Sequence, residues 1–183
     1  MNKILVNYEK IINQIDLYES NNSSKYLRPN LIAVSKTFPV DIIQVLLNHG
    51  HRIFGENKVQ EARQKWTSLK QNNNENNIEL HLIGPLQSNK VNSALEIFDV
   101  IQTLDREKVA LKINNYLEQH NNSLSKKFMI QVNIGNEEQK GGIHKESVFE
   151  FVNWCKNALK LNIIGLMCIP PLSKNSSQYF KEL

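Results

Sequence analysis

The sequence predicts an α/β fold, a TIM-type (β/α) barrel in which a ring of parallel strands is surrounded by helices. Three observations support this prediction. Short apolar stretches alternate with amphipathic helical stretches, which is typical of parallel strands joined by right-handed crossovers. No glycine-rich dinucleotide turn follows an apolar stretch, and polar residues recur where these stretches end. A doubly wound sheet would gather its polar groups in one crevice, whereas a barrel distributes them around one face.

The predicted elements follow a regular order. One N-terminal helix, residues 4–18, precedes six strand–helix units, and the sixth helix only begins before the chain ends. Strands are recognised as short apolar runs, and helices by apolar residues three or four positions apart. The predicted strands span residues 31–34, 52–55, 78–83, 99–103, 127–134 and 163–169. The helices that follow them span residues 40–49, 57–70, 88–97, 105–117, 145–159 and 178–183.

The predicted barrel is incomplete. A (β/α) barrel normally has eight strand–helix units and about 200 residues or more, whereas this chain has 183 residues and six predicted units. We therefore expect a single barrel domain, residues 1–183, that lacks the C-terminal units and is a fragment. Its first and last strands would then have open edges, which favour association between chains. We nevertheless expect a monomer.

Composition excludes several classes of protein. Apolar residues make up 40% of the chain and charged residues 22%, as in a soluble globular domain. The net charge of +4 is a small surplus of 22 basic over 18 acidic residues, without the basic patches of a nucleic-acid-binding protein. No apolar run is long enough to span a membrane. Cys155 and Cys168 do not fit a disulfide scaffold or a metal site, so we expect two buried thiols in the cytoplasm.

Polar residues stand where the predicted strands end: Lys36, Glu56 with Asn57, Thr103 and Asn133. In a (β/α) barrel these carboxyl ends form the active face. A single lysine at a strand end more often extends its amine into solvent, but polar neighbours at equivalent positions favour a binding site. From these residues alone, a phosphate-ligand barrel in which Lys36 merely binds an anion is a further reading.

Several ordered blocks carry a more specific signal. They are Ala33-Val-Ser-Lys-Thr37, Phe54-Gly-Glu-Asn57 with Val59-Gln-Glu61, His81-Leu-Ile-Gly84 with Leu86-Gln-Ser-Asn-Lys90, Gln131-Val-Asn133, Lys140 before Gly142-Ile143, and Gly165-Leu-Met167. In these blocks the chain resembles the pyridoxal phosphate (PLP) homeostasis proteins, the YggS/PROSC-like family. That family is similar to the N-terminal barrel of alanine racemase but lacks the second, β domain of that enzyme.

The resemblance implies a cofactor site. Lys36 would form a Schiff base, a covalent aldimine, with the PLP aldehyde, and partial desolvation at the barrel mouth would lower its pKa. Asn57 would hydrogen-bond the cofactor, or cap the next helix. His81 would contact the cofactor, or be a hydrogen-bonded core histidine. Met167 would line the pocket floor, or be core. Lys140 would hold the phosphate or receive PLP, or be an ordinary loop lysine.

The implied function is a non-catalytic PLP binder and carrier for intracellular PLP homeostasis, with PLP-dependent apo-enzymes as possible recipients. A minimal PLP-dependent amino-acid racemase or lyase is the alternative, although a racemase needs a second acid/base group that this sequence does not offer. Two features depart from the family pattern. Phe38 stands where many members have a polar or basic residue. The resemblance also implies that the phosphate-binding segments belong to the seventh and eighth units, and the sequence ends at Leu183, before either unit. We therefore expect weaker PLP binding than in a complete barrel.

Overall fold

The computed structural model describes residues 3–22, 28–72, 78–120, 126–172 and 176–183. The strands are β1 (Ala33–Val34), β2 (Ile53–Glu56), β3 (Glu79–Leu82), β4 (Val100–Leu104), β5 (Lys127–Val132) and β6 (Ile163–Cys168). The α-helices are α1 (Lys3–Asn22), α2 (Val40–Asn48), α3 (Val59–Asn72), α4 (Val91–Ile97), α5 (Glu107–His120), α6 (Val148–Asn157) and α7 (Ser176–Glu182). Two 3₁₀ turns, η2 (Ser88–Lys90) and η3 (Lys145–Ser147), lead into α4 and α6.

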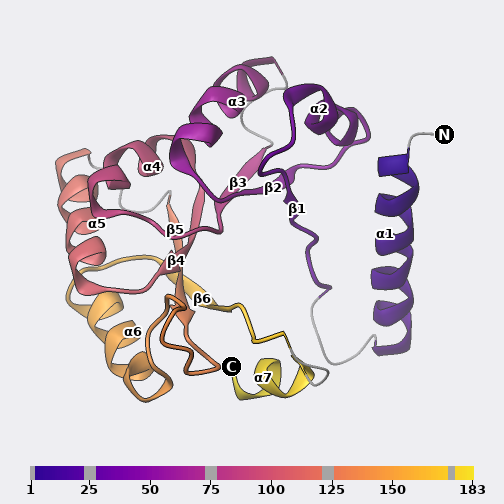
Figure 1. Cartoon of the computed structure of the whole chain (residues 1–183). Helices are drawn as coiled ribbons and strands as arrows, with labels where there is room; N and C mark the ends of the chain where they lie inside the picture. Colours follow the sequence, from indigo (N-terminus) through magenta and orange to yellow (C-terminus); the bar gives the residue numbers. More distant parts are fainter. Residues whose placement is uncertain (1–2, 23–27, 73–77, 121–125, 173–175) are drawn as a thin grey trace.

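All six strands form one parallel sheet in which each strand lies beside the next one in the sequence, in the order β1-β2-β3-β4-β5-β6. Because this order never reverses, the sheet is not doubly wound. The predicted barrel-type fold with about six units is confirmed. Figure 1 shows the sheet curving, with α2 to α6 on its outer side and with α1 and α7 near the side where β1 and β6 are its outermost strands.

The hydrophobic core lies between the outer face of the sheet and the helices. Phe54 of β2 packs against Trp66 of α3 with their ring centroids 4.8 Å apart, and both side chains are fully buried. Along β5, the buried residues Phe128, Ile130 and Val132 alternate with less buried ones. Successive side chains of a strand point to opposite faces, so one face of β5 joins this core and the other lines the inside of the curve.

Burial is greatest in the middle of the sheet. Every residue of β4 is buried, whereas β1 contains one half-buried and one exposed residue, and β6 contains no fully buried residue. The edge strands have a strand neighbour on one side only, within the part of the chain that the structure describes. Exposed apolar side chains therefore occur at both edges, at Val34 on β1 and at Ile164 on β6.

The predicted boundaries differ from the observed ones mainly at the edges and ends. The strand predicted at 31–34 has ladder geometry only at Ala33–Val34, and the strand predicted at 127–134 ends at Val132. After Val132 the chain forms an isolated bridge from that residue to Ile143 and turns into a loop. The N-terminal helix is longer than predicted and extends to Asn22.

Two absences concern the described ranges only. In them, no helix combines the length and apolar character needed to cross a membrane. Within the same ranges, no group of histidine, cysteine and acidic side chains is arranged to hold a metal ion. Cys155 is buried in α6 and Cys168 is half-buried in β6, and both are free thiols.

Candidate functional site

Lys36 lies in a tight turn directly after β1, which we call the lysine turn (residues 35–38). The ladder with β2 continues one residue beyond the strand, because the backbone N–H of Ser35 donates to Gly55 O at 2.9 Å. The turn closes with a hydrogen bond of 3.1 Å from the N–H of Phe38 to Ser35 O. Thr37 adopts a φ of 65°, in the left-handed region that non-glycine residues rarely occupy.

The side chain of Lys36 is exposed. This differs from the expected partial desolvation at a barrel mouth. The reason is that β1 is an edge strand, so in the described residues only β2 flanks it. Within those residues the Lys36 amine has no hydrogen-bond or ion-pair partner of its own, which leaves it accessible to a ligand.

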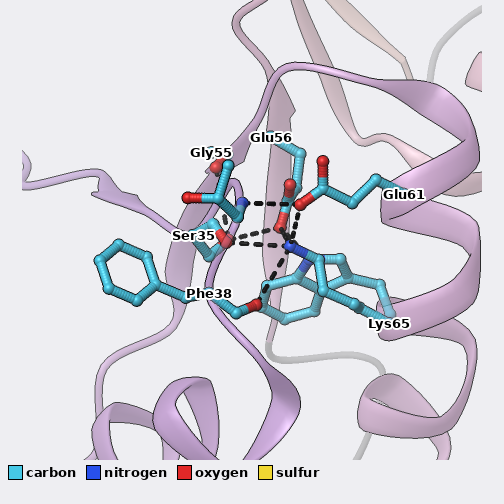
Figure 2. A network of polar contacts seen from close by, with 8 residues as sticks. Ser35, Phe38, Gly55, Glu56, Glu61 and Lys65 are labelled. Carbon is cyan, nitrogen blue, oxygen red and sulfur yellow. Dashed lines mark hydrogen bonds and ion pairs between the residues drawn. The ribbon is translucent and has the colours of Figure 1, made fainter.

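A polar network from β2 and α3 lies against the lysine turn (Figure 2). The ammonium of Lys65, a largely buried side chain of α3, donates to Ser35 O at 2.9 Å and to Phe38 O at 3.4 Å. The carboxylate of Glu61, one helical turn earlier, lies 2.8 Å from the same ammonium and accepts the backbone N–H of Thr37 at 2.6 Å. The pKa of Glu61 is lowered, first by the hydrogen bond from Lys65 and then by that from Thr37.

Glu56, the last residue of β2, is the buried centre of this network. Its side chain is 0% exposed, and one carboxylate oxygen contacts Lys65 Nζ at 2.7 Å. The same oxygen accepts hydrogen bonds from the hydroxyl of Ser35 at 2.8 Å and from the indole N–H of Trp66 at 3.1 Å. A buried carboxylate is stable only with such partners. Through these contacts Glu56 connects β1, β2 and α3.

Asn57 follows β2 at the position equivalent to Lys36 after β1. Val34 pairs with Gly55, so Lys36 and Asn57 each lie two residues beyond a paired position on adjacent strands. Asn57 is half-buried, and a side chain at Gly84 would clash with its backbone, which explains the glycine there. The N–H of Ala62 donates to the carbonyl of the residue that follows Asn57, so Asn57 does not occupy the capping position of α3.

His81 lies deeper in the barrel than the lysine turn. It pairs with Gly55 and is therefore one strand repeat, about 7 Å, below Lys36 and Asn57. Its Nδ1 accepts a hydrogen bond of 2.8 Å from Gln102, and its Nε2 lies 2.8 Å from Glu79 Oε1.

Burial lowers the pKa of His81, outweighing the nearby Glu79 carboxylate. Both ring nitrogens are thus occupied by protein partners, as in a hydrogen-bonded core histidine. Burial alone would raise the pKa of Glu79, but hydrogen bonds from Lys127 and His81 outweigh it and lower the pKa.

Met167 and Lys140 lie at the opposite end of the strand order from Lys36. Met167 is on β6, and Lys140 is in the loop after β5. Met167 is half-buried and pairs with Gln131 of β5. Lys140 forms an ion pair with Glu137 at 2.5 Å and donates to Pro170 O at 3.4 Å. The structure therefore brings Lys36 and Asn57 together on adjacent strands, and it places His81 below them. Lys36 and Asn57 follow β1 and β2, whereas Met167 and Lys140 belong to β6 and to the loop after β5, several strands away in the sheet.

The remaining polar residues at strand ends serve the protein itself. The Thr103 hydroxyl donates to Gly84 O at 2.8 Å. The Asn133 side chain donates to Glu137 O at 2.9 Å and accepts the Glu137 N–H at 3.1 Å, which shapes the loop that contains Lys140. Both side chains are buried. These interactions indicate that a polar residue at a strand end does not by itself mark a ligand contact.

Sequence reasoning missed the role of Lys65. A lysine four residues after a glutamate on a helix is typical of an exposed ion pair, and Lys65 follows Glu61 at this spacing. The available signal was the position of Lys65 immediately before Trp66, because this places it beside the apolar stripe of α3. Its burial then depends on two carboxylates and two carbonyls that come from separate parts of the sequence.

Comparison with known proteins places this chain in a family. The family model for the alanine racemase N-terminal domain matches residues 9–182. Among curated relatives, the pyridoxal phosphate homeostasis protein of Vibrio alginolyticus is 37% identical over 183 residues, which are all of this chain and 76% of that protein. The protein of the same name from Aquifex aeolicus is 35% identical over 156 residues, covering 84% of this chain and 66% of that one.

A solved structure agrees with both. PipY of Synechococcus elongatus, a COG0325 family member whose structure has PLP bound, matches with a TM-score of 0.71 and 30% identity. The match covers 90% of this chain and 74% of PipY. The fold thus defines an alanine racemase N-terminal-type barrel. Within that class, the chain belongs to the family of pyridoxal phosphate homeostasis proteins.

Proposed function

We propose that the chain is a PLP-binding protein of intracellular PLP homeostasis that holds the cofactor on Lys36 and has no catalytic turnover of its own. The observation that carries the proposal is the position of Lys36. It is an exposed amine beyond the first strand of a barrel whose relative PipY was solved with PLP bound. The homologous Vibrio alginolyticus protein carries the name of the same function.

The residues around Lys36 suit an aldehyde ligand. PLP supplies an aldehyde carbon, and the lysine supplies a nitrogen nucleophile once its ammonium has released one proton to solvent. A carbon–nitrogen double bond then forms, and the aldehyde oxygen leaves as water with the two remaining amine hydrogens. In contrast, the ammonium of Lys65 is surrounded by oxygen acceptors. Lys36 is therefore the amine that this part of the protein offers to a ligand.

The structure supports the other predicted cofactor contacts to different degrees. Asn57 stands level with Lys36 on the adjacent strand, and we propose that its amide hydrogen-bonds the cofactor. Met167, a residue of β6, is proposed to line the floor of the cofactor pocket. His81 already uses both ring nitrogens, so its proposed contribution is to the surface beneath the cofactor. We propose that Lys140, which is paired with Glu137, meets PLP only when that pair opens.

The proposal extends to the setting in which the protein works. We propose that residues 1–183 act as one monomeric PLP-binding domain in the cytoplasm, with PLP-dependent apo-enzymes as recipients. The two free thiols support a reducing compartment. Analytical ultracentrifugation tests the monomer, and transfer of PLP to an apo-transaminase, measured by recovery of transaminase activity, tests the recipients.

Titration with PLP tests the binding proposal. The wild-type protein is expected to develop the absorbance of a protein Schiff base and to retain PLP through gel filtration. Lys36→Ala should lose this signal, whereas Lys112→Ala, at an exposed lysine of α5 outside the proposed site, should retain it. Equal absorbance and retention in wild type and Lys36→Ala would contradict the proposal.

A second experiment separates a carrier from an enzyme. The PLP-loaded protein is incubated with L-alanine, and the product is analysed by chiral chromatography. The proposal predicts no D-alanine above a PLP-only control. Formation of D-alanine that depends on Lys36 would instead establish the minimal racemase, and release of keto acid would indicate other amino-acid chemistry.

A further inference from the structure

The backbone of the lysine turn is bound to α3 at residues before and after Lys36. Figure 2 shows Lys65 of α3 beside Ser35 and Phe38, the two ends of the turn. Lys65 donates to the carbonyls of Ser35 and Phe38, which are the first and last residues of the turn. Glu61 accepts the N–H of Thr37, the residue next to Lys36. One helix therefore contacts three backbone groups within four residues of chain, while the Lys36 side chain stays free of them.

These contacts stand where the sheet gives little support. β1 has only two residues and one strand neighbour among the described elements. Thr37 also has a positive φ, a conformation that persists only when its surroundings hold it. Residues 36–38 of the turn are exposed and gain little from packing, whereas hydrogen bonds to charged groups are strong and directional.

We propose that Lys65 and Glu61 are positioning residues for Lys36. Their side chains fix the backbone of the lysine turn so that the Lys36 amine meets a bound aldehyde in the orientation that the reaction requires. This inference rests on the proposed binding of PLP by Lys36. Small losses of orientation have large effects on reactions between bound groups, so the two residues affect PLP binding without touching the cofactor.

The other half of α3 provides a matched control. Lys70 Nζ lies 2.9 Å from Asp99 Oδ2 and donates to Ile97 O at 3.3 Å. Asp99 Oδ2 also accepts the backbone N–H of Leu80 at 2.8 Å. Lys65 and Lys70 are thus both lysines of α3 that bind a carboxylate and a backbone carbonyl. In both sets the carboxylate also accepts a backbone N–H, Glu61 that of Thr37 and Asp99 that of Leu80. Only the Lys65 set touches the lysine turn.

The first test compares Lys65→Met with Lys70→Met in the full chain. We expect Lys65→Met to raise the apparent Kd for PLP by about tenfold or more, and we expect Lys70→Met to leave it within about twofold of wild type. Apparent Kd is measured from Schiff-base absorbance, and chemical denaturation of the PLP-free proteins reports stability. A loss of affinity in both variants that follows their loss of stability would overturn the proposal.

The second test uses Glu61, whose side chain is partly exposed and whose replacement leaves the buried Glu56–Lys65 pair intact. Glu61→Ala removes the acceptor for the Thr37 N–H, whereas Glu61→Gln keeps an oxygen acceptor there. We expect Glu61→Ala to slow Schiff-base formation several-fold and Glu61→Gln to restore much of the rate. A purely structural role predicts that rate follows stability in both variants. Equal rates in Glu61→Ala and wild type would refute the positioning role, even if Lys65→Met does not fold.

The result also distinguishes this inference from the proposed function. If wild type forms no Schiff base, or forms it equally well in Lys36→Ala, the proposed function fails and the positioning role fails with it. If wild type reacts at Lys36 while Lys65→Met and Glu61→Ala react like wild type, only the positioning role fails. Trapping of the cofactor on Lys65 would overturn the assignment of Lys65 as a positioning residue.

Discussion

Strands β4 and β1 stand in opposite environments. Every residue of β4 is buried, and strands flank it on both sides. β1 has two residues and, among the described elements, one strand neighbour, and the turn after it exposes Lys36. The middle of the sheet is held by packing, whereas the turn at the edge is held by charged side chains from α3. The proposed reactive residue thus lies where packing contributes least.

The largest expected effect tests the role of packing. Phe128 of β5 is fully buried and Ile164 of the edge strand β6 is half exposed. Phe128→Ala should lower the free energy of unfolding by about 3–5 kcal/mol, because it removes buried apolar area and leaves a cavity. Ile164→Ala should change it by about 0.5 kcal/mol or less. Urea denaturation followed by circular dichroism measures both values, and similar losses would show that the edge is as well packed as the middle.

A smaller effect tests the charged network. Glu56 is fully buried and lies beside the ammonium of Lys65, whereas Glu96 pairs with Arg63 on the surface. Glu56→Gln should cost about 2 kcal/mol of unfolding free energy, because it unbalances a buried ion pair. Glu96→Gln should cost less than about 1 kcal/mol, as expected of an exposed pair. Equal stability of the two variants would show that the charged network around Glu56 does not stabilise the edge of the sheet.

The pH dependence of stability tests the middle of the sheet. Burial lowers the pKa of His81 in the folded protein, so the unfolded chain binds this proton more readily. Stability should therefore fall as the pH falls through the ordinary histidine range, from about pH 7 to about pH 5, by at most about 1.4 kcal/mol per pH unit for one proton.

His51, whose pKa is also lowered by burial, contributes in the same direction. His81→Gln should reduce the slope of the unfolding free energy against pH. The part of the slope that comes from His51 should remain. Denaturant titrations at a series of pH values provide this measurement. An unchanged slope in His81→Gln would show that His81 titrates alike in the folded and unfolded states.

The smallest effect compares the two thiols. Burial raises the pKa of Cys155, in α6, to about 12, and it also raises the pKa of Cys168 at the edge strand β6. Because the thiolate is the reactive form, both should react slowly with iodoacetamide in the folded protein. Cys168 should react first, since it is half-buried and Cys155 is fully buried. Mass spectrometry of the alkylated protein reveals the order, and faster alkylation of Cys155 would imply that α6 opens readily.

The same contrast explains what could be predicted from the sequence. Apolar periodicity located the six strands of the sheet, because a buried strand has a local apolar pattern. The alternation of strands with helices indicated that the strands are parallel. At the edge the apolar pattern overestimated β1, because the ladder with β2 includes only Ala33 and Val34 and residues 31 and 32 lie outside it. The position of Lys36 after a strand could also be read from the chain. The exposure of its amine could not, because that depends on which strands flank β1.

The contacts of Lys65 and His81 illustrate the same limit. Sequence spacing indicated that His81 points inward, and its partner Glu79 lies only two residues away. Its second partner, Gln102, comes from the next strand and could not be inferred from local pattern. The Lys65 ammonium likewise meets Ser35, thirty positions away in the sequence. Such contacts arise from register and crossover geometry, which a single sequence does not encode locally.

The most direct measurement maps the residue that carries the cofactor. The protein is incubated with PLP at sub-stoichiometric ratio, reduced with borohydride, digested and analysed by mass spectrometry. Our account predicts that the pyridoxyl group lies mainly on the peptide containing Lys36 and that Lys36→Ala loses most of the label. Labelling spread over many surface lysines, or undiminished in Lys36→Ala, would contradict it.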